Sequence, residues 1–158
     1  HSDLRRQRQM CIRDRSTGMG GLGSANKDLI PSQCNAKGTH VDRNKNIITI
    51  YVRRDEAERL ISDFNETGRV AYFASSPAQE AYQFKGQFLK LKELEDNDLD
   101  LSRTWRKGLE EVFKSFDMPE ENINNYLGGD PDVGIEMEIE KIFNQTPGPN
   151  ASKEIEIE

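Results

Sequence analysis

Apolar and polar residues alternate over long parts of this chain, and this period of two is typical of half-buried β-strands. The segments with this pattern, rich in β-branched and aromatic residues, are 30–41, 47–52, 69–75, 80–94 and 133–143. The polar run DRNKN separates the first two segments, so they are predicted to form a hairpin. Short turns between consecutive strands favour antiparallel pairing over a doubly wound parallel sheet.

Helical spacing appears in two places between these strands. After residue 52, Asp55 can cap a short amphipathic helix that ends near Gly68 and carries its apolar residues at Ala57, Leu60, Ile61 and Phe64. A longer helix is predicted from a cap at Ser102, with an apolar stripe at Trp105, Leu109, Val112, Phe113 and Phe116. Trp105 is interpreted as a core residue. A further short helix follows Pro119 and ends at Gly128 and Gly129.

The segment 80–94 predicts a strand with two different faces. Tyr82, Phe84, Gly86 and Phe88 fall on one face, and Gln83, Lys85 and Gln87 fall on the other. This pattern describes an antiparallel strand whose second face is polar or lines a site. The glutamates that alternate along 133–143 are interpreted as a solvated face.

The glycine-rich segment GMGGLG at 18–23 formally matches the dinucleotide fingerprint G-x-G-x-x-G. That fingerprint requires a strand before it and a helix after it, so that the helix amino terminus faces a pyrophosphate. Here an arginine-rich segment precedes it and SANKDLIPS follows, where Pro31 opposes a helix. A flexible or strand-forming glycine segment is the better interpretation.

Composition narrows the function classes. The 158 residues suit one domain, and the net charge of −6 argues against general electrostatic binding of nucleic acid. No apolar run is long enough for a membrane span or a secretory signal, so a soluble, cytoplasmic protein is expected. Cys11 and Cys34 lack the number and spacing of a disulfide framework or a zinc site. His40 is the one histidine outside residues 1–16, which excludes a multi-histidine metal site.

Three regions of unequal character are expected along the chain. Residues 1–16 form an arginine-rich leader without apolar periodicity, and the run LRRQRQMCIRDRS resembles a translated sequencing-adapter read-through. We therefore expect 1–16 to be non-native or disordered, the alternative being a basic arm for an anionic surface. Residues 17–143 are expected to form the domain, and 144–158 an extended or disordered tail.

Three segments in order resemble the pyridoxamine 5'-phosphate oxidase-like, FMN-binding split-barrel family, in its small and poorly characterised branch. They are GSANKDLIPSQCNAKGTHVD at 23–42, ITIYVRRDEAERLISDFNETGRVAYFASSPAQEAYQFKG at 48–86, and IFNQTPGPNA at 142–151. The resemblance implies a mainly β fold with helices, namely a six-stranded antiparallel split β-barrel of Greek-key type. It also implies a homodimer that binds FMN in clefts between its subunits.

The resemblance further implies a set of cofactor-binding residues. Basic, amide and hydroxyl side chains for the flavin phosphate would be Asn35, Lys37, Tyr51, Arg53, Arg54 and Arg59. Gln83 and Lys85 would donate hydrogen bonds to the flavin ring. Asn35 departs from the family, where Arg is common at this position, and the arginines could instead form surface ion pairs. No catalytic residue and no metal ligand is assigned.

The expected activity is FMN-dependent oxidation or reduction of an unidentified small molecule, because the cofactor carries such chemistry. The chain lacks the Arg-x-His element of true pyridoxamine phosphate oxidases, so oxidation of vitamin B6 compounds is not the first choice. A non-enzymatic sensor or store for flavin or haem is the alternative. A structural or partner-binding module remains a third possibility.

Overall fold

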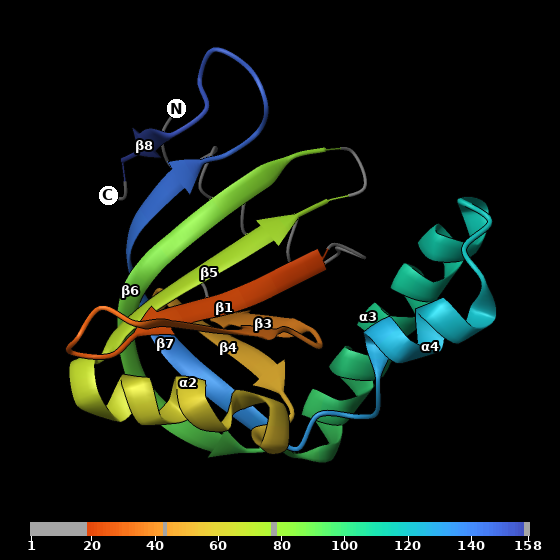
Figure 1. The fold of residues 1–158 in the computed structure, drawn as a ribbon, viewed down its shortest axis with the longest axis horizontal. Coiled ribbons are helices and arrows are strands. Elements are labelled where there is room, and N and C mark those ends of the chain that lie inside the picture. Colours follow the sequence, from red (N-terminus) through yellow and green to blue (C-terminus); the bar gives the residue numbers. More distant parts are fainter. Residues whose placement is uncertain (1–18, 43, 77–78, 157–158) are drawn as a thin grey trace.

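The computed structural model describes residues 19–42, 44–76 and 79–156, which form an antiparallel β-sheet with three helices (Figure 1). The expectations for residues 1–16 fall outside the described residues. In chain order the elements are β1 (Met19–Ala25), β2 (Pro31–Asn35), β3 (Thr39–Asp42), β4 (Ile47–Val52), α2 (Arg54–Thr67), β5 (Arg69–Ser75), β6 (Ala81–Glu93), α3 (Asp96–Ser115), α4 (Glu120–Leu127), β7 (Val133–Asn144) and β8 (Lys153–Ile155).

The strands follow the order β2-β1-β5-β6-β7-β4-β3, and β8 pairs with β7. Each pairing is antiparallel, which confirms the mainly β, antiparallel class. The described residues contain eight strands, however, and not the six that were expected. The difference arises because the segment 30–41 is divided into β2 and β3, and because part of the tail forms β8.

The residues between β2 and β3 connect two strands that are far apart in the sheet order. The Ala36 N–H donates to the carbonyl oxygen of Gly20 on β1, at 2.9 Å. The Lys37 N–H donates to Tyr51 O on β4, at 2.7 Å, and the Tyr51 N–H donates to Gly38 O, at 2.9 Å. Backbone hydrogen bonds therefore tie this segment to β1 on one side and to β4 on the other.

The main core lies between the sheet and α2. Alternating residues of the strands bury Leu22, Tyr72, Phe84 and Met137, and α2 contributes Leu60 among others. In Figure 1, α2 lies across one end of the strands, and it packs on β1 and β2. Full burial of each such side chain contributes about 1.5–3 kcal/mol. The outward-facing residues of β1, β5 and β6 are left to form a surface.

The starts of the two long helices differ from the sequence-based expectation. The residue that caps α2 is Arg53, and Asp55 lies in the first turn, where its carboxylate accepts from the Arg53 guanidinium at 3.1 Å. Helix α3 begins at Asp96 with Glu95 as its cap, because Glu95 and Asp98 form a reciprocal capping box. Ser102 therefore lies inside the helix, and its hydroxyl donates to the carbonyl oxygen of Lys37.

A second, smaller cluster joins α3 to α4. Leu109 and Phe113 of α3 pack with Ile123 and Leu127 of α4, and Trp105 lies against them, in agreement with its expected role in packing. The two helices stand to one side of the sheet in Figure 1. No helix among the described residues is both long and apolar enough to span a membrane.

Candidate functional site

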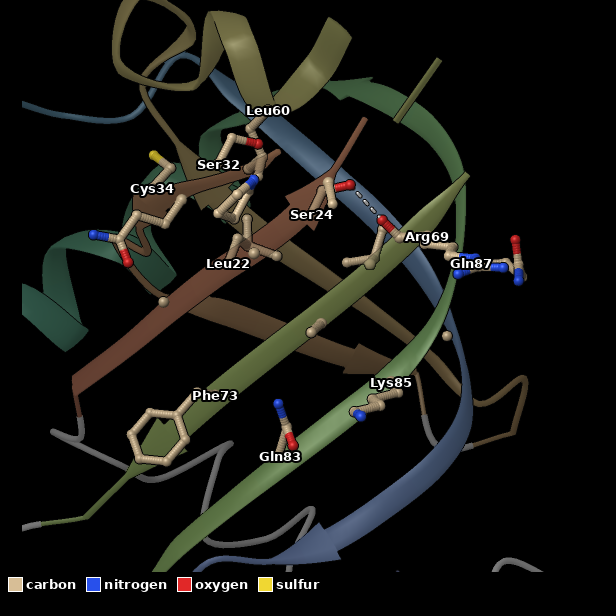
Figure 2. Close-up of a pocket in the computed structure, with 18 of the residues that line it drawn as sticks. Leu22, Ser24, Ser32, Cys34, Leu60, Arg69, Phe73, Gln83, Lys85 and Gln87 are labelled. Atoms are coloured by element: carbon tan, nitrogen blue, oxygen red, sulfur yellow. Dashed lines mark hydrogen bonds between the residues drawn. The ribbon is translucent and has the colours of Figure 1, made fainter. Parts of the chain in front are cut away.

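A groove with a volume of about 1230 Å³ lies on the outward face of the sheet. Strands β1, β2, β5 and β6 form most of its surface, with α2 at one side and Glu140 and Lys141 of β7 at the other. Figure 2 shows Phe73, Gln83 and Lys85 on the strands of this face.

Strand register explains why these residues meet. In an antiparallel sheet, directly paired residues share a face, so one row of pairs forms one stripe of surface. Gly23 of β1 pairs with Ala71 of β5, and Ala71 pairs with Lys85 of β6. In the neighbouring row, Gly21 pairs with Phe73, and Phe73 pairs with Gln83. The floor of the groove therefore contains the small residues Gly21, Gly23 and Ala71, with Phe73 at its edge, and longer polar side chains lie along β6.

Gly21 and Gly23, the two glycines of the floor, are open towards the groove. A Cβ atom at Gly21 would meet only Cys34 O at 3.7 Å, and one at Gly23 would meet only Ser32 O at 3.8 Å. Both are ordinary van der Waals contacts, and neither glycine has a positive φ. The fold would therefore tolerate a side chain at Gly21 and Gly23. The absence of side chains at these positions leaves the backbone exposed as an open floor of the groove.

Gly86 has a different role. A Cβ atom there would overlap the backbone carbonyl of Glu138, because the pairing of β6 with β7 is irregular between Lys85 and Gly86. This β-bulge brings the two backbones close together, and glycine is the residue that fits. The pairing of β6 with β7 therefore requires glycine at position 86.

The groove is basic although the whole chain is acidic. Four basic residues line it, Arg59, Arg69, Lys85 and Lys141, against the two acidic residues Glu56 and Glu140. Within the described part of the chain, none of the four basic groups has a carboxylate within 4.0 Å. Since the chain carries a net charge of −6, this local excess of cations favours an anionic ligand.

The charge of Glu56 is compensated from within the protein. Its carboxylate lies 3.8 Å from Lys37 Nζ and 3.9 Å from Arg53 Nε. Lys37 is 4 % exposed, and its ammonium also donates to the carbonyl oxygen of Leu127, at 2.8 Å. These contacts reduce the repulsion that Glu56 would exert on an anion in the groove.

Of the eight expected cofactor-binding residues, the structure brings four to the groove: Asn35, Arg59, Gln83 and Lys85. The other four lie elsewhere. Lys37 is buried under α4, and Arg53 is engaged with Asp55 and Glu56. Arg54 is exposed at the first turn of α2, outside the groove.

Tyr51 is fully buried, and its hydroxyl donates to Asp98 Oδ1 at 2.7 Å. Burial raises the pKa of Tyr51, and the hydrogen bond to Asp98 raises it further. Its hydroxyl therefore fixes α3 to β4 and does not reach the groove.

Several residues of the groove were absent from the sequence-based set: Gly21, Gly23, Arg69, Ala71, Phe73 and Lys141. The period-two reading of GLG and of RVAYF places the first five on one face, so that signal was present in the sequence. Lys141 was not accessible to such reasoning, because the bulge between Lys85 and Gly86 shifts the register at this point.

The groove holds few groups for acid–base or nucleophilic chemistry. His40 lies on β3, outside the groove. Cys34 is buried, and burial, followed by the charge of Glu56, raises the pKa of its thiol to about 11, so it stays protonated near neutral pH. The described residues contain no group of three or more side chains arranged to bind a metal ion. The open glycine floor and the excess of basic groups suit an anionic ligand.

No family model and no curated protein matches this sequence. Solved structures do match its fold. HupZ of group A Streptococcus is 13 % identical, with a TM-score of 0.53, covering 92 % of this chain and 97 % of that one. A pyridoxamine 5'-phosphate oxidase-related, FMN-binding protein of Nostoc punctiforme is 11 % identical, with a TM-score of 0.50, covering 92 % and 84 %. An F420 reductase is 12 % identical, with a TM-score of 0.51, covering 82 % and 92 %.

At these identities the similarity establishes the fold alone. The resemblance seen in the sequence is confirmed at that level, because the fold is shared with pyridoxamine 5'-phosphate oxidase-like, FMN-binding proteins.

Proposed function

We propose that this chain, which has the fold of FMN-binding split-barrel proteins, is itself an FMN-binding flavoprotein and an oxidoreductase that acts on a small molecule. The observation that carries the proposal is the groove on the outward face, which combines a floor of small residues with an excess of basic groups. A flavin mononucleotide has a flat ring and a phosphate, so it matches both features.

The residues present fit FMN in chemical type. Arg59 is the proposed phosphate ligand, because it is the one of the three expected arginines, Arg53, Arg54 and Arg59, that lines the groove. Asn35 adds a neutral amide on the adjacent strand β2. Gln83 and Lys85 of β6 are proposed to donate to the ring. When bound, FMN supplies hydride or electron transfer, and the protein binds it, orients it and limits access of water.

We propose that two copies of the chain form a homodimer across this face. The groove is open on its outer side, and Phe73 at its edge and Met19 on β1 are 44 % and 41 % exposed. A second copy would cover these apolar side chains and complete a concave site.

Closure of the sheet into a split barrel also belongs to this proposal. It is supported by the backbone hydrogen bonds that join residues 36–38 to both β1 and β4. A closed barrel of this size is filled by its own side chains, so the ligand site must lie outside it.

A non-enzymatic flavin binder is the second candidate. It is favoured by the absence, from the described part of the groove, of histidine and of a reactive thiolate. Because an F420 reductase shares the fold, a deazaflavin is the alternative cofactor. Reduction of the bound flavin by a nicotinamide nucleotide would favour the enzyme over a store or sensor.

The experiment that tests the proposal compares FMN with riboflavin, which has the same ring but no phosphate. Arg59→Ala should weaken FMN binding about tenfold or more in a fluorescence titration, because a charge-assisted hydrogen bond to phosphate is lost. Riboflavin affinity should change little in the same variant.

Arg54→Ala is the matched control. Arg54 is an exposed arginine on the same helix, outside the groove, so its removal alters the net charge equally but should leave both affinities unchanged. Equal losses of FMN and riboflavin in Arg59→Ala, or equal effects of the two arginine variants on FMN, would refute the placement of the phosphate.

A further inference from the structure

Two lysines lie directly opposite each other where β6 meets β7. Lys85 and Lys141 are register partners, so their side chains share the outward face of the sheet, and both are exposed residues of the groove. Like charges in directly opposite positions on paired strands repel each other and destabilise the pairing. An anion between the two ammonium groups would relieve this repulsion.

The described chain does not supply that anion. Three acidic residues lie close by in the sheet: Glu140 in the bulge beside Lys141, Glu138 opposite Gln87, and Glu154 opposite Phe143. None of them forms an ion pair with Lys85 or Lys141 within 4.0 Å. The two cations therefore face the groove without a carboxylate partner from the described residues.

Lys85 is held in place by an aromatic ring. Its Nζ lies 5.0 Å from the centre of the Phe143 ring, which stands two residues beyond Lys141 on β7. A cation above an aromatic face is attracted electrostatically, and this contact keeps the ammonium on the side of β7. An ammonium carries three N–H donors, so Lys85 can contact a flavin ring and an anion together.

This position is separate from the one proposed for the flavin phosphate. Arg59 belongs to α2, which packs on β1 and β2, whereas the two lysines belong to β6 and β7. In the strand order, β6 is two strands from β1 and three from β2, which at about 4.8 Å per strand is roughly 10–14 Å. We therefore assign the phosphate beside Arg59 and the anion between the two lysines to different positions in the groove.

We infer that Lys85 and Lys141 form a second anion-binding position in the groove, which binds the carboxylate or phosphate of a small anionic substrate beside the ring. That the bound anion belongs to a substrate rests on the proposed function, but the anion-binding position itself does not. The unidentified small molecule would then be a carboxylic acid or a phosphate ester.

The position can be tested without flavin. The full chain, labelled with ¹⁵N, is titrated with sodium phosphate and separately with sodium acetate, at constant ionic strength set with sodium chloride. At least one of the two anions should give saturable shifts of the backbone amides around Lys85, Lys141 and Phe143. Lys141→Gln should weaken this binding about tenfold, the loss of one charge-assisted hydrogen bond.

Two further variants distinguish a loss of anion binding from misfolding of the protein. Lys141→Arg keeps the charge and should keep the binding, and Lys45→Gln removes an exposed lysine from the turn between β3 and β4 and should change nothing. Lys141→Gln should unfold at a temperature no lower than the wild type, because a repulsive pair is relieved.

A response to phosphate alone or to acetate alone identifies the anion and supports the inference. The absence of saturable shifts with both anions in the wild type, or unchanged affinity in Lys141→Gln, would overturn it. Flavin binding is measured on the same samples by visible absorption. Anion binding without flavin would refute the proposed function and leave the second position intact, and flavin binding without anion binding would do the reverse.

Discussion

Single glycines in this protein serve two opposite purposes, and the difference can be measured. Gly23 is open towards the groove, whereas the place of a Cβ at Gly86 is occupied by the backbone of β7. We expect Gly23→Val to fold with a free energy of unfolding within about 1 kcal/mol of the wild type, since a β-branched residue suits a strand. Its affinity for riboflavin should fall at least about tenfold, because the new side chain fills the floor.

Gly86→Ala is the structural counterpart. The added methyl group must displace the backbone of Glu138, so we expect a loss of at least about 3 kcal/mol in the free energy of unfolding. Urea denaturation separates the two effects. A Gly23→Val protein that binds riboflavin normally would show that the floor is not where the ring lies.

At the scale of elements, a buried carboxylate anchors α3 to the sheet. Asp98 is 3 % exposed and accepts from the Tyr51 hydroxyl, from Lys92 Nζ at 2.9 and 3.0 Å, and from the Glu95 N–H at 2.9 Å. Burial by itself would raise the pKa of Asp98, but these hydrogen bonds outweigh it and hold the pKa below its ordinary value. The ionised form therefore stabilises the fold.

The sign of the pH dependence follows from this shift. A carboxyl whose pKa is depressed in the folded state contributes stability above its unfolded pKa, near 4, and loses that contribution as the pH falls through its folded pKa. We expect Asp98→Asn to cost about 2–3 kcal/mol at pH 7, because Lys92 loses its partner. The difference from the wild type should shrink as the pH is lowered from about 4 to 2.

Chemical denaturation across this pH range gives the measurement, with Asp130→Asn as the control. Asp130 pairs with Arg103 at 3.1 Å on the surface, where both side chains are about half exposed, so that variant should change stability by less than about 1 kcal/mol. A constant difference between Asp98→Asn and the wild type from pH 7 to 2 would contradict the account.

The elements also show how far sequence reasoning reached. Strands β4, β5, β6 and β7 and helices α2, α3 and α4 were predicted, because their periods of two and 3.6 record burial directly. Helix starts were wrong, since Glu95 with Asp98 caps α3 through a contact that the apolar stripe does not reveal. The division of the segment 30–41 was missed because it depends on a change of partner from β1 to β4, which is a property of the assembled sheet.

The candidate site was predicted less completely than the fold, for the same reason. Alternation within one strand placed Gln83 and Lys85 on a polar face, the family resemblance implied their role, and both line the groove. Lys37 and Tyr51 were chosen by likeness to relatives, but in this chain their polar ends bind Leu127 and Asp98 in the interior. Whether a side chain faces a groove or the core is decided by elements distant in sequence, in this case α3 and α4.

At the scale of the whole molecule, the proposed binding of FMN and the proposed homodimer both depend on the groove. The groove is open on the side where Phe73 is exposed, and a planar ligand lying on Gly21, Gly23 and Ala71 would be half covered by one chain alone. A second copy would supply the missing cover. We therefore expect the cofactor and the second subunit to be bound together.

Sedimentation velocity of the full chain mixed with FMN, recorded at a protein wavelength and at a visible flavin wavelength, tests this claim most directly. We expect a single boundary with twice the mass of the chain, seen at both wavelengths, and we expect Gly23→Val to lose the flavin signal. A boundary with the mass of one chain and no flavin absorption, at micromolar concentration, would contradict it.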